Sequence, residues 1–590
     1  MYNGKKILAV ILARGGSKRI PEKNIKLLKN KPLIAYTLEE AEKCTLLDRI
    51  VISSDDEKIL DICRTYKCTL QTRPKELAED STPSIDVLQY VMKETEQQEK
   101  YDVIVLLQPT SPLRKSAAIE ECIRMLIDHT VDSVQTITKA KEHPSIMFKK
   151  ESDHFVFNSK EFQDPKGEYY VLNGAVYAVT ASVLKSGTLY GARNKSVIMD
   201  QSESIDIDTM DDWIIAEQRL EIRNIPLSAP FIEEDDIQAV VNVLRTSTLS
   251  LGPKLQEFEE KVAAYIGTKY AVAVNSGTSA LHLAAKAIGL KPGDEVITTP
   301  FTFVATANAI LFEHATPIFA DIDEHTYTID PNEIEKKITP KTKAIIDVDV
   351  FGYPSHKTEL AAIAKKHNLK IIEDSAEAIG TTYDGKKVGS FFECGIFAFY
   401  PNKQLTTGEG GILVTNNEEI AKLAKSYRNQ GRGESGPWLQ HVRIGYNYRL
   451  SDINCALGIS QMNKVERILA KREKKAELYT KILSTFPEIT IPPQSTEHRK
   501  VSWFVYVIQV PKRDEVMKRL KQRGVNCAAY FTPLHLTDFY QKEFSFKKGD
   551  FPVCERIAER TLALPFYTAI SSEQIEYVCK QLREILDELQ

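Results

Sequence analysis

The sequence lacks several features that would place it in a special class of protein. Its nine cysteines are scattered and none forms a CxxC pair, so a zinc cage or a thioredoxin-type site has no support. Reduced thiols in a cytoplasmic protein are the simpler interpretation. The apolar run Ile7–Ala13 has seven residues and ends on Arg14, whereas a membrane span needs about 20 apolar residues. We therefore expect a cytoplasmic protein without a membrane span, and we interpret this run as a buried first strand.

Strong charge imbalance is absent as well. The 77 basic and 81 acidic residues leave a net charge of −4, which gives no global electrostatic reason to expect nucleic acid or a membrane as a partner. Hydrophobic residues at 43% and charged residues at 27% are globular proportions and exclude a disordered or collagen-like chain. With 590 residues, the chain exceeds the roughly 250–300 residues at which one hydrophobic core stops growing. Two or more domains are expected.

Two successive stretches of the chain alternate strands with helices. In the first, short apolar runs are separated by helical patterns, which predicts a largely parallel α/β sheet covered on both faces. The strands expected there are Ile7–Leu12, Arg49–Ile52, Val103–Leu107 and Ser133–Ile137. A helix around Trp213–Ile222 ends this pattern, and a new helix is expected over Asp235–Leu244. No Gly/Ser-rich or Pro-rich linker lies between them. We therefore place two α/β domains at 1–223 and 224–590, the second with a small C-terminal subdomain.

A basic loop with two glycines follows the first expected strand. Residues 13–19 read ARGGSKR and residues 21–24 read PEKN. The glycines let backbone N–H groups approach an anion, and the cationic side chains neutralise negative charge. This fits a triphosphate at the carboxyl edge of a parallel sheet, with a solvated basic turn as the alternative. The GxxxxGK[ST] spacing of a Walker A loop is absent.

Two further segments of the first half carry polar groups suited to a nucleotide site. Leu106–Arg114 places an amide, hydroxyls and a guanidinium directly after another expected strand. Ile205–Asp208 alternates isoleucine with aspartate, so in a strand both carboxylates face the same way. Mg²⁺ bound together with phosphate oxygens would relieve their repulsion. A pair of exposed aspartates at a strand edge is the alternative.

Together these segments resemble the cytidylyltransferase family that activates sialic acids and related nonulosonates as CMP-sugars. The motifs ILARGGSK…PEKN, LLQPTSPLR, NGAVY and SIDID match in order over roughly residues 5–220. The resemblance implies that the anomeric hydroxyl of an acidic sugar attacks the α-phosphate of CTP, with Mg²⁺ as cofactor. In this chain Arg14 and Lys23 would be catalytic, with Arg14, Ser17 and Lys23 holding phosphates, Gln108 the sugar, Asn173 lining the sugar pocket, and Asp206 and Asp208 holding Mg²⁺.

One departure from that family concerns the acidic sugar. Members often carry an arginine about ten residues before the NGA motif, where it serves the sugar acid. Here residues 161–165 read EFQDP. The acid sugar therefore differs from common sialic acid, or another residue does that work.

The second half contains a possible phosphate cup, a carboxylate at a strand end and a lysine among aromatic residues. Asn275–Ser279 precedes an expected helix over Ala280–Ile288, where helix N–H groups could hold an anion or simply be capped. The expected strand Ile371–Asp374 ends on a carboxylate. Lys403 lies close to Phe397, Phe399 and Tyr400 in the sequence, so it is either a partly desolvated nucleophile or an ordinary loop lysine. These are the parts that a pyridoxal phosphate site needs.

Their order and spelling resemble the DegT/DnrJ/EryC1/StrS sugar aminotransferases over roughly residues 224–590. The matching motifs are GPKLQEFE, NSGTSALHLA, GDEVITTPFTFVATANAI, EDSAEAIG, FYPNKQLTTGEGG and GYNYRLSDINCALG. The resemblance implies a fold-type-I enzyme that uses pyridoxal 5′-phosphate to transaminate a keto-sugar nucleotide, with L-glutamate as the expected amino donor.

The resemblance also assigns roles to individual residues. Lys403 and Asp374 would be catalytic: Lys403 would bind the cofactor covalently and move the proton, and Asp374 would pair with the pyridinium nitrogen. Phe303 would stack on the ring, Glu377 would lie by the ring hydroxyl, and Gly277, Thr278 and Ser279 would cradle the phosphate. Asn447 would reach the phosphate of a neighbouring subunit, which implies a homodimer or a higher oligomer. Ala398 and Glu377 stand where relatives commonly have serine and glutamine.

Two histidines stand out in the sequence. We expect His535 to line the entrance for the sugar nucleotide, and we interpret His143 as a packing residue. Overall, the sequence predicts a bifunctional enzyme of nucleotide amino-sugar biosynthesis without channelling between its sites. An enzyme with an active aminotransferase half only is one alternative. A sensory or regulatory protein built on the same fold is another, and the intact pair of Lys403 and Asp374 disfavours it.

Overall fold

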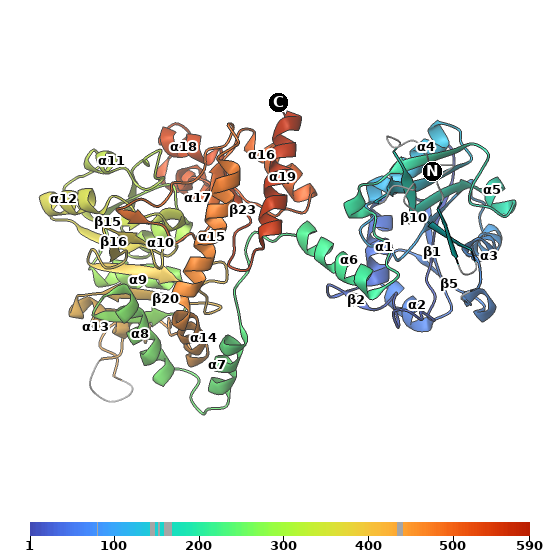
Figure 1. Ribbon diagram of the computed structural model, residues 1–590. Helices are drawn as coiled ribbons and strands as arrows, with labels where there is room; N and C mark the ends of the chain where they lie inside the picture. Colours follow the sequence, from blue (N-terminus) through green and yellow to red (C-terminus); the bar gives the residue numbers. More distant parts are fainter. Residues whose placement is uncertain (80, 142–147, 152–153, 158–167, 434–439, 590) are drawn as a thin grey trace. The chain divides into compact units, whose positions relative to one another are not determined.

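The structure is a computed structural model that describes residues 1–590 except 80, 142–147, 152–153, 158–167, 434–439 and 590 (Figure 1). His143 and the segment 161–165 lie outside the described residues. The chain divides into two compact units, Met1–Glu221 and Ile222–Gln590. This division lies close to the boundary that the sequence analysis places near Asn224.

The first unit is built on a seven-stranded sheet. β10 runs antiparallel to its neighbours β6 and β7, and the other pairs of strands are parallel. The strands, in their order across the sheet, are β11 (Asn194–Ile198), β7 (Ser133–Lys139), β10 (Tyr170–Thr180), β6 (Val103–Leu107), β1 (Ile7–Leu12), β4 (Arg49–Ser54) and β5 (Thr69–Thr72). Short hairpins add β2 (Leu27–Leu28) with β3 (Lys31–Pro32) and β8 (Phe148–Glu151) with β9 (His154–Phe157).

Helices cover both faces of this sheet. The helices are α1 (Leu33–Lys43), α2 (Glu57–Cys63), α3 (Ser84–Glu96), α4 (Ser116–Asp128), α5 (Ala181–Lys185) and α6 (Met210–Arg223). Alternate residues of β1 enter different cores, since Ile7 and Ile11 pack with α1, α2 and α4, whereas Leu8 and Val10 pack with α3 and α5. A strand buried on both faces reads as a continuous apolar run, which explains why the segment 7–12 was recognisable in the sequence.

The second unit contains another seven-stranded sheet. β20 runs antiparallel to β12 and β19, and the remaining pairs are parallel. The strands in order are β12 (Tyr270–Val274), β20 (Gly411–Thr415), β19 (Cys394–Ala398), β16 (Lys370–Asp374), β15 (Thr342–Val348), β13 (Glu295–Thr298) and β14 (Thr316–Phe319). A small three-stranded sheet is formed by β18 (Lys386–Lys387), β17 (Thr382–Tyr383) and β21 (Arg499–Lys500).

Helices also cover both faces of the second sheet. Ile346 and Ile372 pack with α9 and α10 on one face, whereas Ile345 and Ile371 pack with α11 and α12 on the other. The helices before the C-terminal part are α7 (Glu234–Leu244), α8 (Pro253–Ile266), α9 (Gly277–Ala287), α10 (Val304–Phe312), α11 (Pro331–Glu335), α12 (Lys357–His367), α13 (Glu418–Arg428) and α14 (Asp452–Asn463). The fold is therefore mixed α/β in both units, as predicted.

The C-terminal part of the second unit has a core of its own. Its elements are α15 (Val465–Leu483), β22 (Tyr506–Gln509), α16 (Arg513–Gln522), α17 (Asp538–Phe544), α18 (Pro552–Ala558), β23 (Thr561–Leu564) and α19 (Ser572–Leu589). Tyr479, Tyr506 and Leu582 belong to one buried cluster there, and α15 crosses this part beside β23 in Figure 1. Among the described residues, no helix combines the length and apolar character that crossing a bilayer requires.

Candidate active sites

Four of the residues predicted to bind substrate line one cavity in the first unit. The cavity has a volume of about 310 Å³ and lies at the carboxyl ends of β1 and β6. Arg14, Ser17, Lys23 and Gln108 contribute to its wall. Parallel strands that end at one edge bring their following loops together, so residues far apart in the sequence share this cavity.

The loop after β1 is shaped by close packing against the segment after β4. The amide of Gly15 donates to Asp55 Oδ1 at 3.2 Å, and a Cβ atom at Gly15 would lie 2.6 Å from Asp56 Oδ2. Asn24 Nδ2 donates to the carbonyl of Arg14 at 2.9 Å and closes the loop. Only glycine at position 15 therefore lets the loop lie against this segment, which places the side chains of Arg14 and Ser17 in the wall of the cavity.

Arg73 is a site residue that the sequence analysis missed. It directly follows β5, lines the same cavity and is 6% exposed. Burial lowers its pKa, and the nearby positive charge of Arg14 lowers it further, whereas Asp55, with Oδ1 at 3.7 Å from Nη2, raises it. Among the described residues, Arg73 Nε has no hydrogen-bond partner. A buried guanidinium with an unused donor in a cavity wall is suited to an anionic ligand. The one sequence feature that could have identified Arg73 is its position directly after a strand.

The two predicted metal ligands lie on an extended segment that is not part of the sheet. Ile205 and Ile207 are buried while Asp206 and Asp208 face outward, which is the predicted alternation. The segment is not a strand, and the amide of Ile207 donates to the carbonyl of Thr110 at 2.9 Å in the loop after β6. Both carboxylates nevertheless face the same way, as the alternation with isoleucine indicated for an extended segment.

Groups that raise and groups that lower the pKa of Asp206 surround these aspartates. Desolvation by surrounding protein raises the pKa of Asp206, and the negative charges of Asp208 and Asp212 raise it further, against a hydrogen bond from Thr110 and the positive charge of Lys23. Lys23 Nζ donates to the carbonyl of Ile207 at 2.6 Å and lies 3.4 Å from Asp208 Oδ1. The basic loop and the acidic segment therefore meet, as the sequence analysis required.

No group of three or more histidine, cysteine or acidic residues among the described residues is arranged to hold a metal by itself. Mg²⁺ commonly keeps several waters and takes one or two carboxylates together with substrate phosphates. The Asp206–Asp208 pair fits that donor set, and it would need the nucleotide to complete the coordination.

The NGA motif lies on an irregularity of β10. The register of β10 against β7 shifts between Leu172 and Tyr177, and Gly174 has a left-handed φ of +71°. A Cβ atom at Gly174 would lie 3.2 Å from Asp206 Oδ2 and 3.3 Å from Gln108 Oε1. Three predicted motifs of the first half therefore converge at this glycine.

Asn173 itself is buried and already hydrogen-bonded within the protein. Its Oδ1 accepts from Thr136 Oγ1 at 2.6 Å, and its Nδ2 donates to Ser204 Oγ at 2.9 Å. In this structure Asn173 holds the irregular part of β10 to its neighbours. Its predicted contact with the sugar stays a prediction.

In the second unit, α9 begins at the predicted phosphate cup. Ser276 caps the helix, and its Oγ accepts from the amide of Ser279 at 3.1 Å. Gly277 packs against the end of β19, since a Cβ atom there would lie 2.8 Å from the Cβ of Ala398. With the amide of Ser279 taken by this cap, the N-terminus of the helix offers the backbone N–H groups of Gly277 and Thr278 to an anion.

Asp374 ends β16 and is buried. Its Oδ2 accepts from Thr306 Oγ1 at 2.7 Å and its Oδ1 from the amide of Ala376 at 3.3 Å. Burial raises the pKa of Asp374 to about 6, and the negative charge of Glu377 adds to this, whereas the two hydrogen bonds and Lys403 oppose it. A buried carboxylate of this kind is suited to a cationic N–H partner such as a pyridinium nitrogen.

Lys403 lies between a carboxylate and an aromatic ring. Its Nζ is 3.2 Å from Glu377 Oε1 and 3.9 Å from the centre of the Phe504 ring. Glu377 is fixed in turn, because its Oε2 accepts from the amide of Phe351 at 2.9 Å. The charges of Lys403 and Glu377 both act on the pKa of Asp374, which agrees with the predicted grouping of these three residues.

The remaining predicted cofactor contacts are exposed. Phe303 precedes α10 and is 61% exposed. Asn447 is exposed on a segment that pairs with Asn429. Their positions permit the predicted contacts with a cofactor and with a second subunit, which stay predictions.

The expectation for His535 was wrong. His535 is completely buried, its Nε2 lies 2.9 Å from Glu555 Oε1, and its ring packs edge-on against Phe551. It therefore joins η5 (Leu534–Leu536) to α18 and does not line an open entrance.

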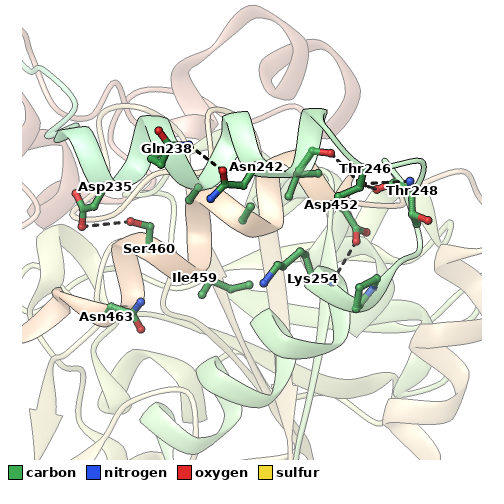
Figure 2. A pocket seen from close by; sticks show the side chains of 14 residues that line it. Asp235, Gln238, Asn242, Thr246, Thr248, Lys254, Asp452, Ile459, Ser460 and Asn463 are labelled. Carbon is green, nitrogen blue, oxygen red and sulfur yellow. Dashed lines mark hydrogen bonds between the residues drawn. The ribbon is translucent and has the colours of Figure 1, made fainter.

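A separate cavity of about 610 Å³ lies between α7, α14 and the start of α8 (Figure 2). Asp452 of α14 accepts from the amide of Lys254 at 3.1 Å, and Gln238 donates to Asn242 at 2.8 Å along α7. None of the predicted site residues lines this cavity.

The fold and the sites define a nucleotidyltransferase-type unit followed by a fold-type-I aminotransferase unit. A family model described as the DegT/DnrJ/EryC1/StrS aminotransferase family matches residues 230–583. A second one, described as cytidylyltransferase, matches residues 8–200. The chain belongs to the DegT/DnrJ/EryC1/StrS aminotransferase family and carries a cytidylyltransferase domain ahead of it. Both are families of enzymes.

Curated and solved relatives match the aminotransferase part. The spore coat polysaccharide biosynthesis protein SpsC of Bacillus subtilis is 38% identical over 378 residues, covering 61% of this chain and 97% of that protein. Helicobacter pylori PseC, an aminotransferase involved in the biosynthesis of pseudoaminic acid, superposes with a TM-score of 0.59 and 31% identity, covering 62% and 100% of the two chains. The PLP-form of the putative sugar aminotransferase Spr1654 of Streptococcus pneumoniae gives 0.60 and 29%, with coverage of 62% and 100%. Pyridoxal phosphate is therefore a cofactor of this family.

Proposed function

We propose that the protein is a bifunctional enzyme of nucleotide amino-sugar biosynthesis. The second unit would transfer an amine from L-glutamate to a keto-sugar nucleotide, and the first would transfer CMP from CTP to an acidic sugar of the nonulosonate type. The observation that supports the proposal is that residues expected at each site lie together. Lys403 Nζ lies 3.2 Å from Glu377 Oε1, three residues after Asp374 at the end of β16, and Arg14, Ser17, Lys23 and Gln108 line one cavity. The similarity to PseC, which is involved in the biosynthesis of pseudoaminic acid, supports the proposal that both units act in the biosynthesis of an acidic sugar.

In the aminotransferase site, bound pyridoxal phosphate would supply an electron sink for the bonds broken at the amine-bearing carbon. The chain supplies the groups around it. The N-terminus of α9 would hold the phosphate, Asp374 would hold a proton at the ring nitrogen, and Phe303 would cover one face of the ring. Lys403 Nζ would bind the cofactor and carry a proton to and from the substrate carbon, with Glu377 beside it at 3.2 Å.

In the cytidylyltransferase site, catalysis would rest on positioning and charge neutralisation. Arg14, Ser17 and Lys23 would hold the triphosphate, and Arg73 adds a buried positive charge in the same wall. Asp206 and Asp208 would hold Mg²⁺ against the phosphates. Gln108 and Asn173 would orient the sugar so that its anomeric hydroxyl attacks the α-phosphorus and pyrophosphate leaves.

The first prediction tests the lysine. Wild-type protein incubated with pyridoxal phosphate should turn yellow and show the absorbance band of a lysine-bound cofactor, and L-glutamate should convert that band. Lys403→Ala should lose the band, because no other amine stands beside Glu377 and Phe504 among the described residues. Lys387→Ala is the matched control, since its Nζ lies 4.2 Å from the centre of the Tyr265 ring in the same unit. A colourless wild-type protein would refute the aminotransferase assignment.

The second prediction tests the metal pair. Pyrophosphate release should require a divalent cation, prefer CTP over other nucleoside triphosphates and fall at least tenfold in Asp208→Ala. Asp211→Ala is the control, because Asp211 is exposed in the first turn of α6 nearby in sequence. Full activity of Asp208→Ala would exclude the metal role. Activity of the aminotransferase alone, with no pyrophosphate release from any acidic sugar tested, would favour an enzyme with one active half.

A further inference from the structure

An aromatic ring from the C-terminal part of the second unit covers Lys403. Phe504 lies two residues before the start of β22, and it is 1% exposed. The centre of its ring lies 3.9 Å from Lys403 Nζ, within the range of a cation–π contact. With Glu377 Oε1 at 3.2 Å, the lysine is held between a carboxylate and a ring face.

The backbone that presents this ring has an uncommon conformation. Trp503 has a left-handed φ of +51°, which bulky residues rarely adopt. Such a conformation costs free energy and persists only where the surroundings impose it. Strained residues of this kind gather at functional sites, and Trp503 is the immediate neighbour of Phe504.

Arg472 of α15 imposes that conformation from one side. Its Nε donates to the carbonyl of Trp503 at 2.8 Å and its Nη2 to the carbonyl of Phe504 at 2.7 Å. Within the part of the chain that the structure describes, none of its hydrogen-bond partners is a carboxylate, and burial lowers its pKa to about 9. Burial of a guanidinium without a carboxylate partner costs free energy. The two hydrogen bonds to these carbonyls offset part of that cost.

Ser502 ties the same segment to the loop of Lys403 from the other side. Ser502 Oγ accepts from Gln404 Nε2 and from Thr381 Oγ1, each at 2.9 Å. Gln404 is the neighbour of Lys403, and its Nε2 also donates to the carbonyl of Glu377 at 2.6 Å. The segment Ser502–Phe504, which we call the lysine strap, is therefore fixed at both ends around the reactive amine.

We propose that the lysine strap positions Lys403 for catalysis, with Phe504 acting directly on the lysine and Arg472 acting through Phe504. The inference rests on the proposed function in that Lys403 is taken as the cofactor-binding lysine. The ring face attracts the ammonium form and excludes water from one side of Nζ. Glu377 lies on the other side of Nζ, so the amine can accept and donate a proton only from a small set of positions. Phe504 is a positioning residue here, and so is Arg472.

The strap has a measurable consequence for the reaction. Without the ring, Lys403 Nζ samples more positions, and a misplaced proton carrier slows the chemical step more than it weakens substrate binding. We expect Phe504→Leu to lower kcat about tenfold while the KM for the sugar nucleotide stays within twofold of wild type. Phe504→Tyr keeps the ring and should restore kcat to within threefold.

The experiment combines these kinetics with a readout that does not depend on turnover. Cofactor-free full-length protein is mixed with pyridoxal phosphate, the appearance of the absorbance band is followed, and the adduct is trapped with borohydride and located by peptide mass spectrometry. Phe504→Leu should capture the cofactor on Lys403 several-fold more slowly than wild type. Phe486→Leu is the matched control, because the Arg583 guanidinium lies 3.9 Å from the Phe486 ring in the same C-terminal part, as the Lys403 amine does from Phe504.

A variant of Arg472 provides a second, independent test of the lysine strap. Arg472→Lys keeps a positive charge but replaces the two-pronged guanidinium by a single ammonium group, so it should reproduce the slow capture of Phe504→Leu. The double variant should be no slower than either single variant, since both act on one contact. Circular dichroism establishes that each variant is folded, and Phe504→Tyr remains informative if Phe504→Leu unfolds.

The outcomes separate the two proposals. A capture rate and a kcat of Phe504→Leu within twofold of wild type would overturn the positioning role while leaving the aminotransferase assignment intact. Equal defects in Phe504→Leu and Phe486→Leu would also overturn it, because the effect would then be general destabilisation. Failure of wild-type protein to form the band on Lys403 would instead overturn the proposed function.

Discussion

At the scale of single residues, the most unusual feature near the aminotransferase site is a buried cluster of four charged groups. Lys357 Nζ lies 2.7 Å from Asp347 Oδ2, 2.8 Å from Asp349 Oδ1 and 3.2 Å from Glu373 Oε2, and all four side chains are buried. Three carboxylates share one ammonium group, so at least one negative charge lacks compensation from it. The cluster adjoins the strand end that carries Asp374, because the amide of Asp349 donates to the carbonyl of Asp374 at 3.1 Å.

The third prediction concerns the pH dependence that this cluster creates. Burial raises the pKa of Asp349 to about 7, and the charges of Asp347 and Glu373 add to this effect, against Lys357. A carboxyl group whose folded pKa exceeds its ordinary 3.8 stabilises the fold below the ordinary value, and that contribution is lost as pH rises through the folded value. Asp349→Asn resembles the protonated form at every pH. Its melting temperature relative to wild type should therefore rise by a few °C between pH 5 and pH 8, at roughly 2 °C per kcal/mol for a unit of this size.

Calorimetric melting curves across that pH range test this prediction. Asp514→Asn is the control, because the side chain of Asp514 is 82% exposed in the same unit and should show a flat difference. A difference for Asp349→Asn that stays constant or falls with pH would show that Asp349 is ionised throughout.

At the scale of elements, the sequence predicted the strands well and the contacts between their loops less well. Ile7–Leu12 and Val103–Leu107 begin and end where expected, because strands buried on both faces leave continuous apolar runs. Segment 205–208 shows the limit: its alternation predicted which side chains are buried, but its partner is a loop carbonyl and not a strand.

Contacts between distant segments explain the residues that sequence reasoning missed. Phe504 and Arg472 gain their roles only because α15 and the segment before β22 meet the loop of Lys403. Nothing in the local pattern around either residue encodes that meeting. Arg14 and Gln108, by contrast, were recognisable because each closely follows a strand at the edge where a parallel sheet gathers its loops.

The fourth prediction concerns the junction between β6 and β10 in the first unit. Arg114 is buried, and its Nη1 donates to the carbonyls of Gln108 at 3.1 Å and Ala175 at 2.9 Å. Its Nε and Nη2 have no partner among the described residues, and burial lowers its pKa to about 10. Arg114 therefore joins two motif-bearing strand ends and carries a buried positive charge that the negative charge of Glu40 offsets only in part.

These two effects oppose each other in Arg114→Met. Loss of the donor leaves two carbonyls unpaired, at about 1–3 kcal/mol for each buried group, whereas removal of the buried charge offsets this cost. We expect pyrophosphate release to fall at least tenfold while the melting temperature of the first unit changes by only a few °C. Arg124→Met on α4 serves as the control, since Arg124 packs on the Tyr2 ring away from these strand ends. Wild-type pyrophosphate release by Arg114→Met would contradict the positioning role.

At the scale of the whole molecule, each unit contains complete buried cores of its own. The first unit holds clusters on both faces of its sheet and a third around Trp213. The second holds separate clusters on the faces of its sheet and in its C-terminal part. Each unit also carries its own proposed site beside a strand end. A core and a proposed site in each unit are what independent folding and independent chemistry require.

The last prediction follows from that independence. A ligand that binds only the folded form stabilises the unit that holds it by RT ln(1 + [L]/Kd), about 2.7 kcal/mol at one hundred times Kd. In calorimetry of the full chain, pyridoxal phosphate should raise only the transition of the second unit, and CTP with Mg²⁺ only that of the first. Lys403→Ala should abolish the first of these shifts and leave the second, and Asp208→Ala should do the reverse. If either ligand moved both transitions together, the two units would unfold as one cooperative structure, and a defect in one site would then be expected to alter the other.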